Sequence, residues 1–306
     1  MMHALFLVAA LALPCLALAA DVVGTITILE GQAMIYRAGG RVHAAEGVRI
    51  ASGDIVETAA SSFAQIETAD QSLAQFGPST RVMISGPAPR QKAGRSMYMI
   101  DGWIKLVSPK REAGAEPGFE LRSAQFEVAP SPSVIVLRNA PSAVDLFVES
   151  GSVRIGERQP GNTAPATVSL KAGDFYQRKL PARGNVASGS PPAFVGDMPR
   201  PFRDSLPPRI ERFRERPVQP KDAPAFAYAD VQAWLQGEPA LRRPLMQRWR
   251  SKAQEPAFRA ALVAHLSAHP EWDPILFPEK YKPKEPPRPT ATVGRAVSDA
   301  ASAAAR

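Results

Sequence analysis

Hydrophobic and polar residues alternate between residues 64 and 84. The positions able to be buried are Ala64, Ile66, Thr68, Ser72, Ala74, Phe76, Pro78, Thr80, Val82 and Ile84, and between them stand Gln65, Glu67, Gln75, Ser79 and Arg81. Because successive side chains of a strand point to opposite faces, this period of two predicts short strands with one buried face and one solvated face. The turn at Asp70-Gln71 divides the run.

The same strand-like rhythm continues from Val22 to about Gln177. Strands are expected at 22–29, 33–37, 97–100, 103–107, 119–121, 126–129, 134–137, 144–148, 153–155, 168–170 and 175–177. Asp101-Gly102, between two of these apolar runs, predicts a tight reversal because glycine readily takes a positive φ. No helical period occurs before Pro199. Short strands with frequent turns predict a β-sandwich, a β-barrel or a solenoid.

The period becomes helical from about Tyr228. Apolar residues share helix faces in three groups, which are Val231, Trp234 and Leu235, then Leu241, Leu245, Met246 and Trp249, then Phe258, Leu262 and Leu266. This spacing predicts three short helices in a small bundle. Its expected core is Trp234, Trp249, Phe258 and Leu262, closed by Trp272, Ile275, Leu276 and Phe277.

These patterns divide the chain into five parts. We expect a signal peptide at 1–20, a β domain at 21–180, a Pro-rich linker at 181–226, a small helical domain at 227–282 and a disordered tail at 283–306. The prolines of the linker are expected to prevent both helix and strand pairing, except for a short helical turn within 209–215.

The first twenty residues are apolar and end in small residues, with Ala17-Leu18-Ala19 just before Asp21. This arrangement predicts a cleaved export signal rather than a membrane span. The chain's one cysteine, Cys15, lies inside that segment. The exported protein would therefore hold no thiol nucleophile, disulfide or Cys-ligated metal, and we do not expect a lipoprotein form.

Basic residues are concentrated in the C-terminal part. Residues 186–306 hold 19 Lys and Arg against 13 Asp and Glu, which is +6 of the net charge of +8. The densest cluster is Arg242, Arg243, Arg248, Arg250 and Lys252. If these side chains line one side of a helix, they offer an anion-binding or partner-binding face; the alternative is an ordinary solvated surface. Outside the cytoplasm, an anionic envelope polymer, lipid headgroups or an acidic protein is a more suitable ligand than nucleic acid.

Several residues of the β part resemble the pattern of FecR-type envelope domains. They are Gly53-Asp54, Thr58, Asp70-Gln71-Ser72, Ala74, Phe76, Pro78, Thr80 and Val82, followed by Phe126 to Pro130, Val144 to Val153 and Val168 to Gly173. The resemblance covers roughly residues 23–178, with Gln71 where the family usually has glycine. It implies a solenoid-like stack of short strands in which each coil buries its apolar face on the next. Known members are sigma regulators whose periplasmic domain senses an outer-membrane receptor.

Few residues suggest chemistry. His265 and His269 have the i, i+4 spacing of metal ligands on a helix, but Leu266 stands where the zinc-protease motif needs glutamate, so capping or surface positions are favoured. His43 is the only histidine of the strand-rich part that could serve as a base for a serine nucleophile. We therefore expect no catalytic, cofactor or metal site.

The sequence thus predicts a non-enzymatic periplasmic protein with a FecR-like β module and a basic helical domain. It would bind an envelope or membrane protein in sensing or scaffolding. Direct contact with a sigma factor is not expected, because an export signal occupies the place of the family's cytoplasmic segment. The alternative is a peptidoglycan or anionic polysaccharide binder, for which Tyr98, Trp103 and Tyr176 are candidate stacking platforms.

Overall fold

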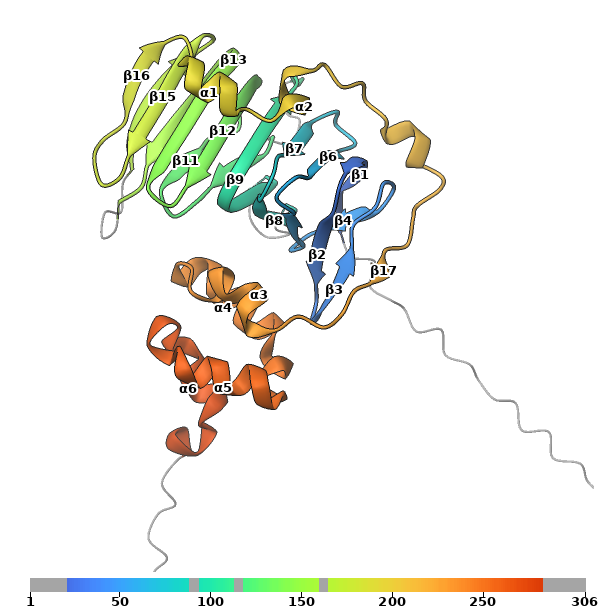
Figure 1. Ribbon diagram of the computed structural model, residues 1–306, viewed down its shortest axis with the longest axis vertical. Coiled ribbons are helices and arrows are strands. Elements are labelled where there is room, and N and C mark those ends of the chain that lie inside the picture. The colour runs from blue at the N-terminus through green and yellow to red at the C-terminus, as the bar shows by residue number, and fades with distance from the viewer. Residues whose placement is uncertain (1–20, 88–93, 113–117, 160–164, 283–306) are drawn as a thin grey trace, which may run out of the picture.

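The computed structural model describes residues 21–87, 94–112, 118–159 and 165–282 (Figure 1). Strands hold 41% of these residues and helices 24%, and a helical region lies at the C-terminal end, which confirms the predicted mainly β class. No helix in these ranges is both long and apolar enough to cross a bilayer.

The strands lie in two layers. The first has the order β4 (Arg49–Ala51), β1 (Val22–Glu30), β6 (Phe63–Glu67), β7 (Leu73–Phe76), β9 (Ser96–Ser108), β12 (Ser133–Ala140), β13 (Ala143–Glu157), β15 (Asp174–Lys179) and β16 (Asn185–Ser188). The second has the order β17 (Lys221–Asp222), β3 (Gly40–His43), β2 (Ala33–Arg37), β5 (Ile55–Thr58), β8 (Arg81–Ser85), β9, β10 (Glu120–Arg122), β11 (Phe126–Val128), β13 and β14 (Ala166–Lys171). Apolar side chains of both layers fill the space between them.

Two long strands, β9 and β13, belong to both layers and join all 17 strands into one hydrogen-bonded network. A closed ring runs from β9 through β12, β13, β11 and β10 back to β9. The sheet is therefore barrel-like and closed, and the solenoid-like stack implied by the family resemblance is not shown. Closure removes free strand edges within this ring.

A glycine bends each shared strand. Gly102 has φ 107° and Gly151 has φ 78°. A Cβ at Gly102 would lie 2.4 Å from the Thr80 Cα, and one at Gly151 would lie 2.3 Å from the Pro132 carbonyl oxygen. Only glycine fits both restrictions. The prediction of a tight reversal at Asp101-Gly102 is wrong, because this dipeptide bends one continuous strand from a pairing with β8 to a pairing with β12.

The face of the 64–84 run that was expected to be solvated is partly buried. Gln65, Glu67 and Gln75 are each less than 4% exposed. They form a polar chain in which the Gln75 amide donates to the Gln65 oxygen at 2.8 Å and the Gln65 amide donates to Glu67 at 2.9 Å. The expectation of a wet face fails here because the later Pro-rich segment covers it. Ser79 is exposed and Arg81 is half-buried.

The Pro-rich segment is an ordered belt, a name we use for residues 189–222. It holds α1 (Pro192–Asp197), α2 (Arg200–Arg203), the 3-10 turn η1 (Ile210–Phe213) and β17, and Figure 1 shows it passing around the outside of β1 to β4. Its side chains Phe194, Met198 and Phe202 pack with residues of the first layer. The expectation that proline excludes helix and pairing is wrong, because the prolines of α1 and α2 occupy first helical turns. The predicted helical turn within 209–215 is present as η1.

The helical region packs on the outer face of the second layer. It consists of α3 (Tyr228–Leu235), α4 (Pro239–Arg248), α5 (Pro256–Ala264), α6 (Asp273–Leu276) and the short turns η2 (Arg250–Gln254), η3 (Leu266–Ala268), η4 (Pro270–Trp272) and η5 (Pro278–Tyr281). All four predicted core residues are buried, as are Trp272 and Leu276, which confirms the predicted bundle core. The same cluster includes Tyr36 and Ile55 of the β part. One apolar core therefore joins the helices to the sheet.

Gln71 has φ 64° and an exposed side chain. This is the position where the FecR pattern has glycine, and a left-handed conformation strains residues that carry a Cβ. We expect Gln71→Gly to raise the free energy of unfolding by about 0.5–1 kcal/mol, after the higher chain entropy of glycine is subtracted. Urea denaturation measures the change. The control is Gln247→Gly on the exposed side of α4, which should instead lower stability by about 0.5–1 kcal/mol. Equal signs for the two variants would contradict the assignment.

Candidate functional site

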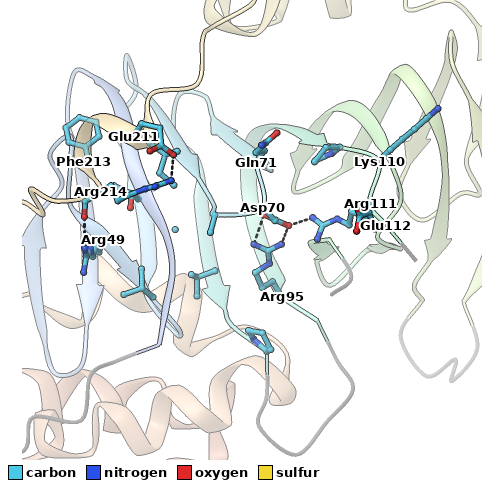
Figure 2. A pocket seen from close by; sticks show the side chains of 18 residues that line it. Arg49, Asp70, Gln71, Arg95, Lys110, Arg111, Glu112, Glu211, Phe213 and Arg214 are labelled. Carbon is cyan, nitrogen blue, oxygen red and sulfur yellow. Dashed lines mark hydrogen bonds and ion pairs between the residues drawn. The ribbon is translucent and has the colours of Figure 1, made fainter. Parts of the chain in front are cut away.

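A groove with a volume of about 950 Å³ lies at one end of the β part. We call it the Asp70 groove. Val22 to Thr25 of β1 line it. One wall contains the Asp70-Gln71 turn with Arg95 and residues 109–112, and the other contains Arg49 with η1 of the belt (Figure 2). Its charged lining comprises five cations, Arg49, Arg95, Lys110, Arg111 and Arg214, and three carboxylates, Asp70, Glu112 and Glu211. The lining therefore has a formal charge of +2.

Asp70 is the centre of one wall. It lies in the turn between β6 and β7, which is closed by hydrogen bonds between Thr68 and Ser72 backbones and from the Gln71 N–H to the Thr68 carbonyl. Arg95 donates to both carboxylate oxygens, and Arg111 forms a second ion pair with the same carboxylate (Figure 2). Two guanidinium groups thus share one carboxylate, so this wall keeps a positive charge.

Arg95 is held in place from several sides. The residue is 8% exposed, and its guanidinium lies 4.7 Å from the centre of the Phe119 ring. Its Nε has no hydrogen-bond acceptor among the described residues. Burial alone would raise the pKa of Asp70, but hydrogen bonds from Arg95 and Thr68 and the charge of Arg111 outweigh it and hold that pKa well below its ordinary value of 3.8. The wall is therefore rigid and ionised at neutral pH.

This lowered pKa predicts an acid sensitivity. A carboxyl whose pKa is lower in the folded state contributes stability above its unfolded pKa, and that contribution is lost as the pH falls through the folded value. We expect Asp70→Asn to be less stable than wild type at neutral pH, with the difference shrinking below about pH 4. Urea denaturation at several pH values measures it. Asp204→Asn, at an exposed carboxylate of the belt, is the control. A difference independent of pH would contradict the role of the Asp70 charge.

The opposite wall depends on Glu67. This carboxylate is 1% exposed and accepts hydrogen bonds from the Thr27 hydroxyl at 2.6 Å and from the backbone N–H groups of Arg209 at 2.8 Å and Ile210 at 3.0 Å. The last two fix the start of η1, which brings Arg214 to the groove. The expectation that Glu67 is a solvated surface carboxylate is wrong, because the belt, far away in the sequence, covers it.

The predicted basic cluster is divided by the structure. Arg242 forms a bidentate pair with Glu271 at 2.8 Å and donates to two backbone carbonyls, so it closes the helical bundle. Arg248 donates to the Gly53 carbonyl of the β part, and burial lowers its pKa. Both guanidinium groups are therefore internal connections between segments.

The other three cluster members lie differently. Lys252 is buried, pairs with Glu255 at 2.8 Å and lies 4.5 Å from the centre of the Phe226 ring. Arg243 and Arg250 are exposed. The structure thus leaves two of the five predicted residues on the surface. The cations of the Asp70 groove were missed because they come from distant segments; the adjacent pair Lys110-Arg111 after a strand was the one local sign.

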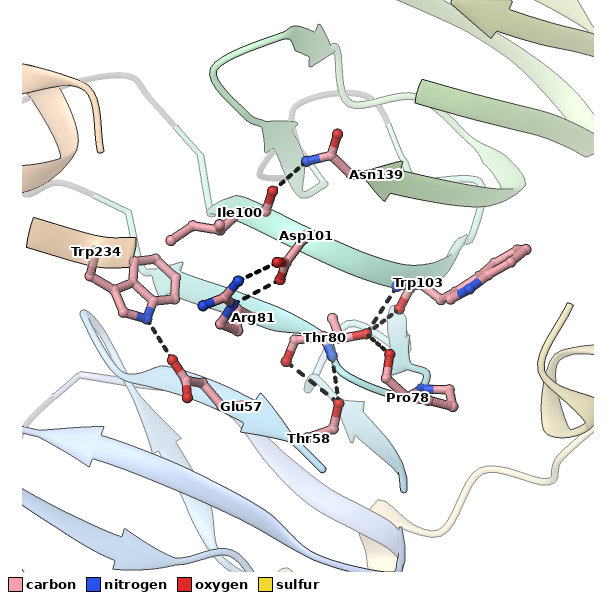
Figure 3. A network of polar contacts seen from close by, with 10 residues as sticks. All are labelled: Glu57, Thr58, Pro78, Thr80, Arg81, Ile100, Asp101, Trp103, Asn139 and Trp234. Atoms are coloured by element: carbon pink, nitrogen blue, oxygen red, sulfur yellow. Dashed lines mark hydrogen bonds and ion pairs between the residues drawn. The ribbon is translucent and has the colours of Figure 1, made fainter. Parts of the chain in front are cut away.

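The FecR-like residues of the 53–82 stretch have structural contacts (Figure 3). The Thr58 hydroxyl donates to the Gly77 carbonyl at 2.6 Å and accepts from the Thr80 N–H at 2.9 Å. The Thr80 hydroxyl accepts from the Trp103 N–H at 2.9 Å. These buried bonds fix the turn at Pro78 against the bend of β9. The threonines of the motif therefore maintain the fold and leave the groove chemistry to other residues.

A second polar contact joins the helices to the sheet. The Trp234 indole N–H donates to Glu57 at 2.6 Å (Figure 3), and the Tyr36 hydroxyl lies 3.3 Å from the same carboxylate. Burial raises the pKa of Glu57 and of Tyr36, the latter to about 12. Both groups stand in the joint between the two parts, where they keep α3 in register with β5.

The three aromatic residues that the sequence offered as stacking platforms are buried or half-buried. Tyr176 is buried, Tyr98 is half-buried beside Glu238, and the half-buried Trp103 ring packs on Phe194 at 5.2 Å. No one of these aromatic residues offers an open stacking face.

The two spaced histidines also have contacts within the bundle. His269 is buried with its Nε2 3.0 Å from the Tyr228 hydroxyl, and the His265 ring stacks on Tyr228. Among the residues that the structure describes, no group of three His, Cys, Asp or Glu could hold a metal ion.

Comparisons with known proteins gave few matches. No family model and no curated protein matches the chain. Two crystal structures, both described as a "putative anti-sigma factor" from Parabacteroides distasonis ATCC 8503, at 2.50 Å and 1.65 Å resolution, are similar with a TM-score of 0.36 and 14% identity. Each match covers 44% of this chain and 59% of the other chain, so it spans less than two thirds of those proteins. A TM-score this low supports no conclusion about this chain.

Proposed function

We propose that this protein is a FecR-like, non-enzymatic envelope module that acts in the periplasm by binding another protein, in signal sensing or as a scaffold. The observation that carries the proposal is the Asp70 groove, whose wall is built on the same Asp70-Gln71-Ser72 turn that belongs to the FecR-like pattern. The groove is large, open to solvent and positively charged, and it is held by internal hydrogen bonds on both sides.

The side chains of the groove favour binding over catalysis. Arginine keeps its charge at every pH a protein tolerates, so the guanidinium groups of Arg49, Arg111 and Arg214 can attract and orient an anionic partner but serve poorly as proton donors or acceptors. Asp70, the most enclosed carboxylate, is fixed in the ionised state by two arginines. The groove is thus suited to electrostatic recognition, and direct contact with a sigma factor is not part of the proposal.

Binding of peptidoglycan or an anionic polysaccharide is the second candidate, favoured by the positive lining of the groove. The burial of Tyr176 and the packing of Trp103 weigh against it, because glycan binding commonly relies on exposed aromatic faces.

Photo-crosslinking in cells tests the proposal. A benzophenone amino acid is placed at Lys110, in the groove, and in a separate variant at Val186, an exposed residue of β16 at the other end of the β part. We expect a discrete protein adduct from position 110 and none from position 186. Adducts of equal pattern from both positions, or a mature protein found only in the cytoplasm, would refute the proposal. Sedimentation with purified sacculi tests the second candidate function. Binding of peptidoglycan requires that the protein co-sediment with the sacculi at physiological salt.

A further inference from the structure

The first residues of β1 lack a strand neighbour on one side. Pairing with β4 begins at Val22, whereas pairing with β6 begins only at Thr25. Among the described residues, Val22 to Gly24 therefore have a ladder partner on a single side, and all three line the Asp70 groove, where Val22 is exposed and Val23 and Gly24 are buried. An unpaired stretch of strand offers its backbone N–H and C=O groups to an added extended chain.

The β1 part of the groove lining is apolar at Val22 and Val23, and cations lie at both sides of the groove. Val22 is 55% exposed, and Phe213 of the belt lines the same groove. Figure 2 shows Arg49 and Arg214 on one side of the groove and Arg111 with Lys110 on the other. Lys110 is exposed and has no ion-pair partner among the described residues.

We propose that the groove binds an extended peptide segment as an added strand beside Val22–Gly24, with an apolar or β-branched middle and a carboxylate near each end. The inference rests on the proposed function and specifies its ligand. One carboxylate meets Lys110 and Arg111, and the other meets Arg49 and Arg214. A volume of about 950 Å³ lies at the upper end of the range for ligand pockets, which leaves room for several residues. The buried Arg95, whose Nε lacks a partner, supports the wall against which the first carboxylate docks.

A peptide explains these features better than a glycan. A peptide backbone supplies alternating donors and acceptors that match an unpaired strand, whereas a polysaccharide would meet the charges without using the strand edge. The strand edge of β1 thus gives affinity through hydrogen bonds to the main chain of the peptide, and the cations at the two sides of the groove set the position of the peptide.

Fluorescence anisotropy with the purified full chain tests the inference. The probe is a labelled peptide of sequence Asp-Val-Thr-Val-Thr-Asp with blocked ends. Two further probes are its Asn-for-Asp counterpart and a form with N-methyl groups on alternate backbone amides. We expect both changed peptides to bind about tenfold more weakly or worse, since each loses charge-assisted or ladder hydrogen bonds.

Charge reversal in the groove completes the test. Lys110→Glu with Arg214→Glu should weaken binding of the first probe about tenfold or more, whereas Lys171→Glu, at an exposed residue of β14, should leave it unchanged. Circular dichroism confirms that the variants fold. The added-strand inference would be overturned if the N-methylated peptide bound as tightly as the first probe. It would also be overturned if polyglucuronate bound as tightly as the first probe and N-methylation of the peptide had no effect. Crosslinking to a protein at residue 110 would still support the proposed function in that case, so the two failures are distinguishable.

Discussion

Trp234→Ala is expected to lower the free energy of unfolding by about 3–5 kcal/mol, because it removes a fully buried tryptophan side chain at the joint between helices and sheet. The loss has two parts. The cavity left in the shared core costs packing energy, and the carboxylate of Glu57 loses the indole donor that lies 2.6 Å away. Urea denaturation measures the change.

Two companion variants separate these contributions. Trp234→Phe keeps most of the ring volume but removes the hydrogen bond, and we expect a cost of about 1–3 kcal/mol. Val263→Ala, at an exposed residue of α5, should change stability by less than about 0.5 kcal/mol. If Trp234→Ala behaved like Val263→Ala, the helices would not be joined to the sheet through this core.

Glu67→Ala is expected to lower the free energy of unfolding by about 3–5 kcal/mol and to release the belt. The substitution leaves the Thr27 hydroxyl and the N–H groups of Arg209 and Ile210 buried without their acceptor. Faster tryptic cleavage at the exposed arginines Arg212 and Arg214 reports the release, and urea denaturation reports the stability.

The exposed belt carboxylate Glu211 supplies the matched control. Glu211→Ala removes a negative charge one residue after Ile210 but no buried acceptor, so stability and cleavage rate should change little. Glu67→Gln keeps one acceptor oxygen and should lie between the two. Unchanged cleavage in Glu67→Ala would mean that the belt is held by its apolar contacts alone.

The parts of the fold that could be predicted from the sequence are those whose apolar residues repeat with a local period. The alternation around Ile66 and Phe76 gave β6 and β7, and the helical spacing of Trp234, Trp249 and Phe258 gave the bundle core. In each case the pattern of burial repeats within a few residues, so neighbours in the sequence carry the whole signal.

The features that were missed depend on distant segments. Gly102 and Gly151 resemble turn residues locally, and only the choice of partner strand makes them bends in continuous strands. The burial of Gln65 and Glu67 requires the belt, which follows more than a hundred residues later. The groove likewise combines side chains from β4, a turn, a strand end and the belt, and no motif links them.

The belt and helices also have a consequence for biosynthesis. Both cover apolar residues on the outer faces of the sheet, such as Phe175 on one side and Ile55 on the other, and both follow the strands in the sequence. A nascent chain synthesised only as far as β16 would therefore expose two apolar surfaces until the belt and the helical region have been synthesised. Such intermediates are prone to aggregate, so a chaperone that binds the incomplete chain should raise the yield of folded protein.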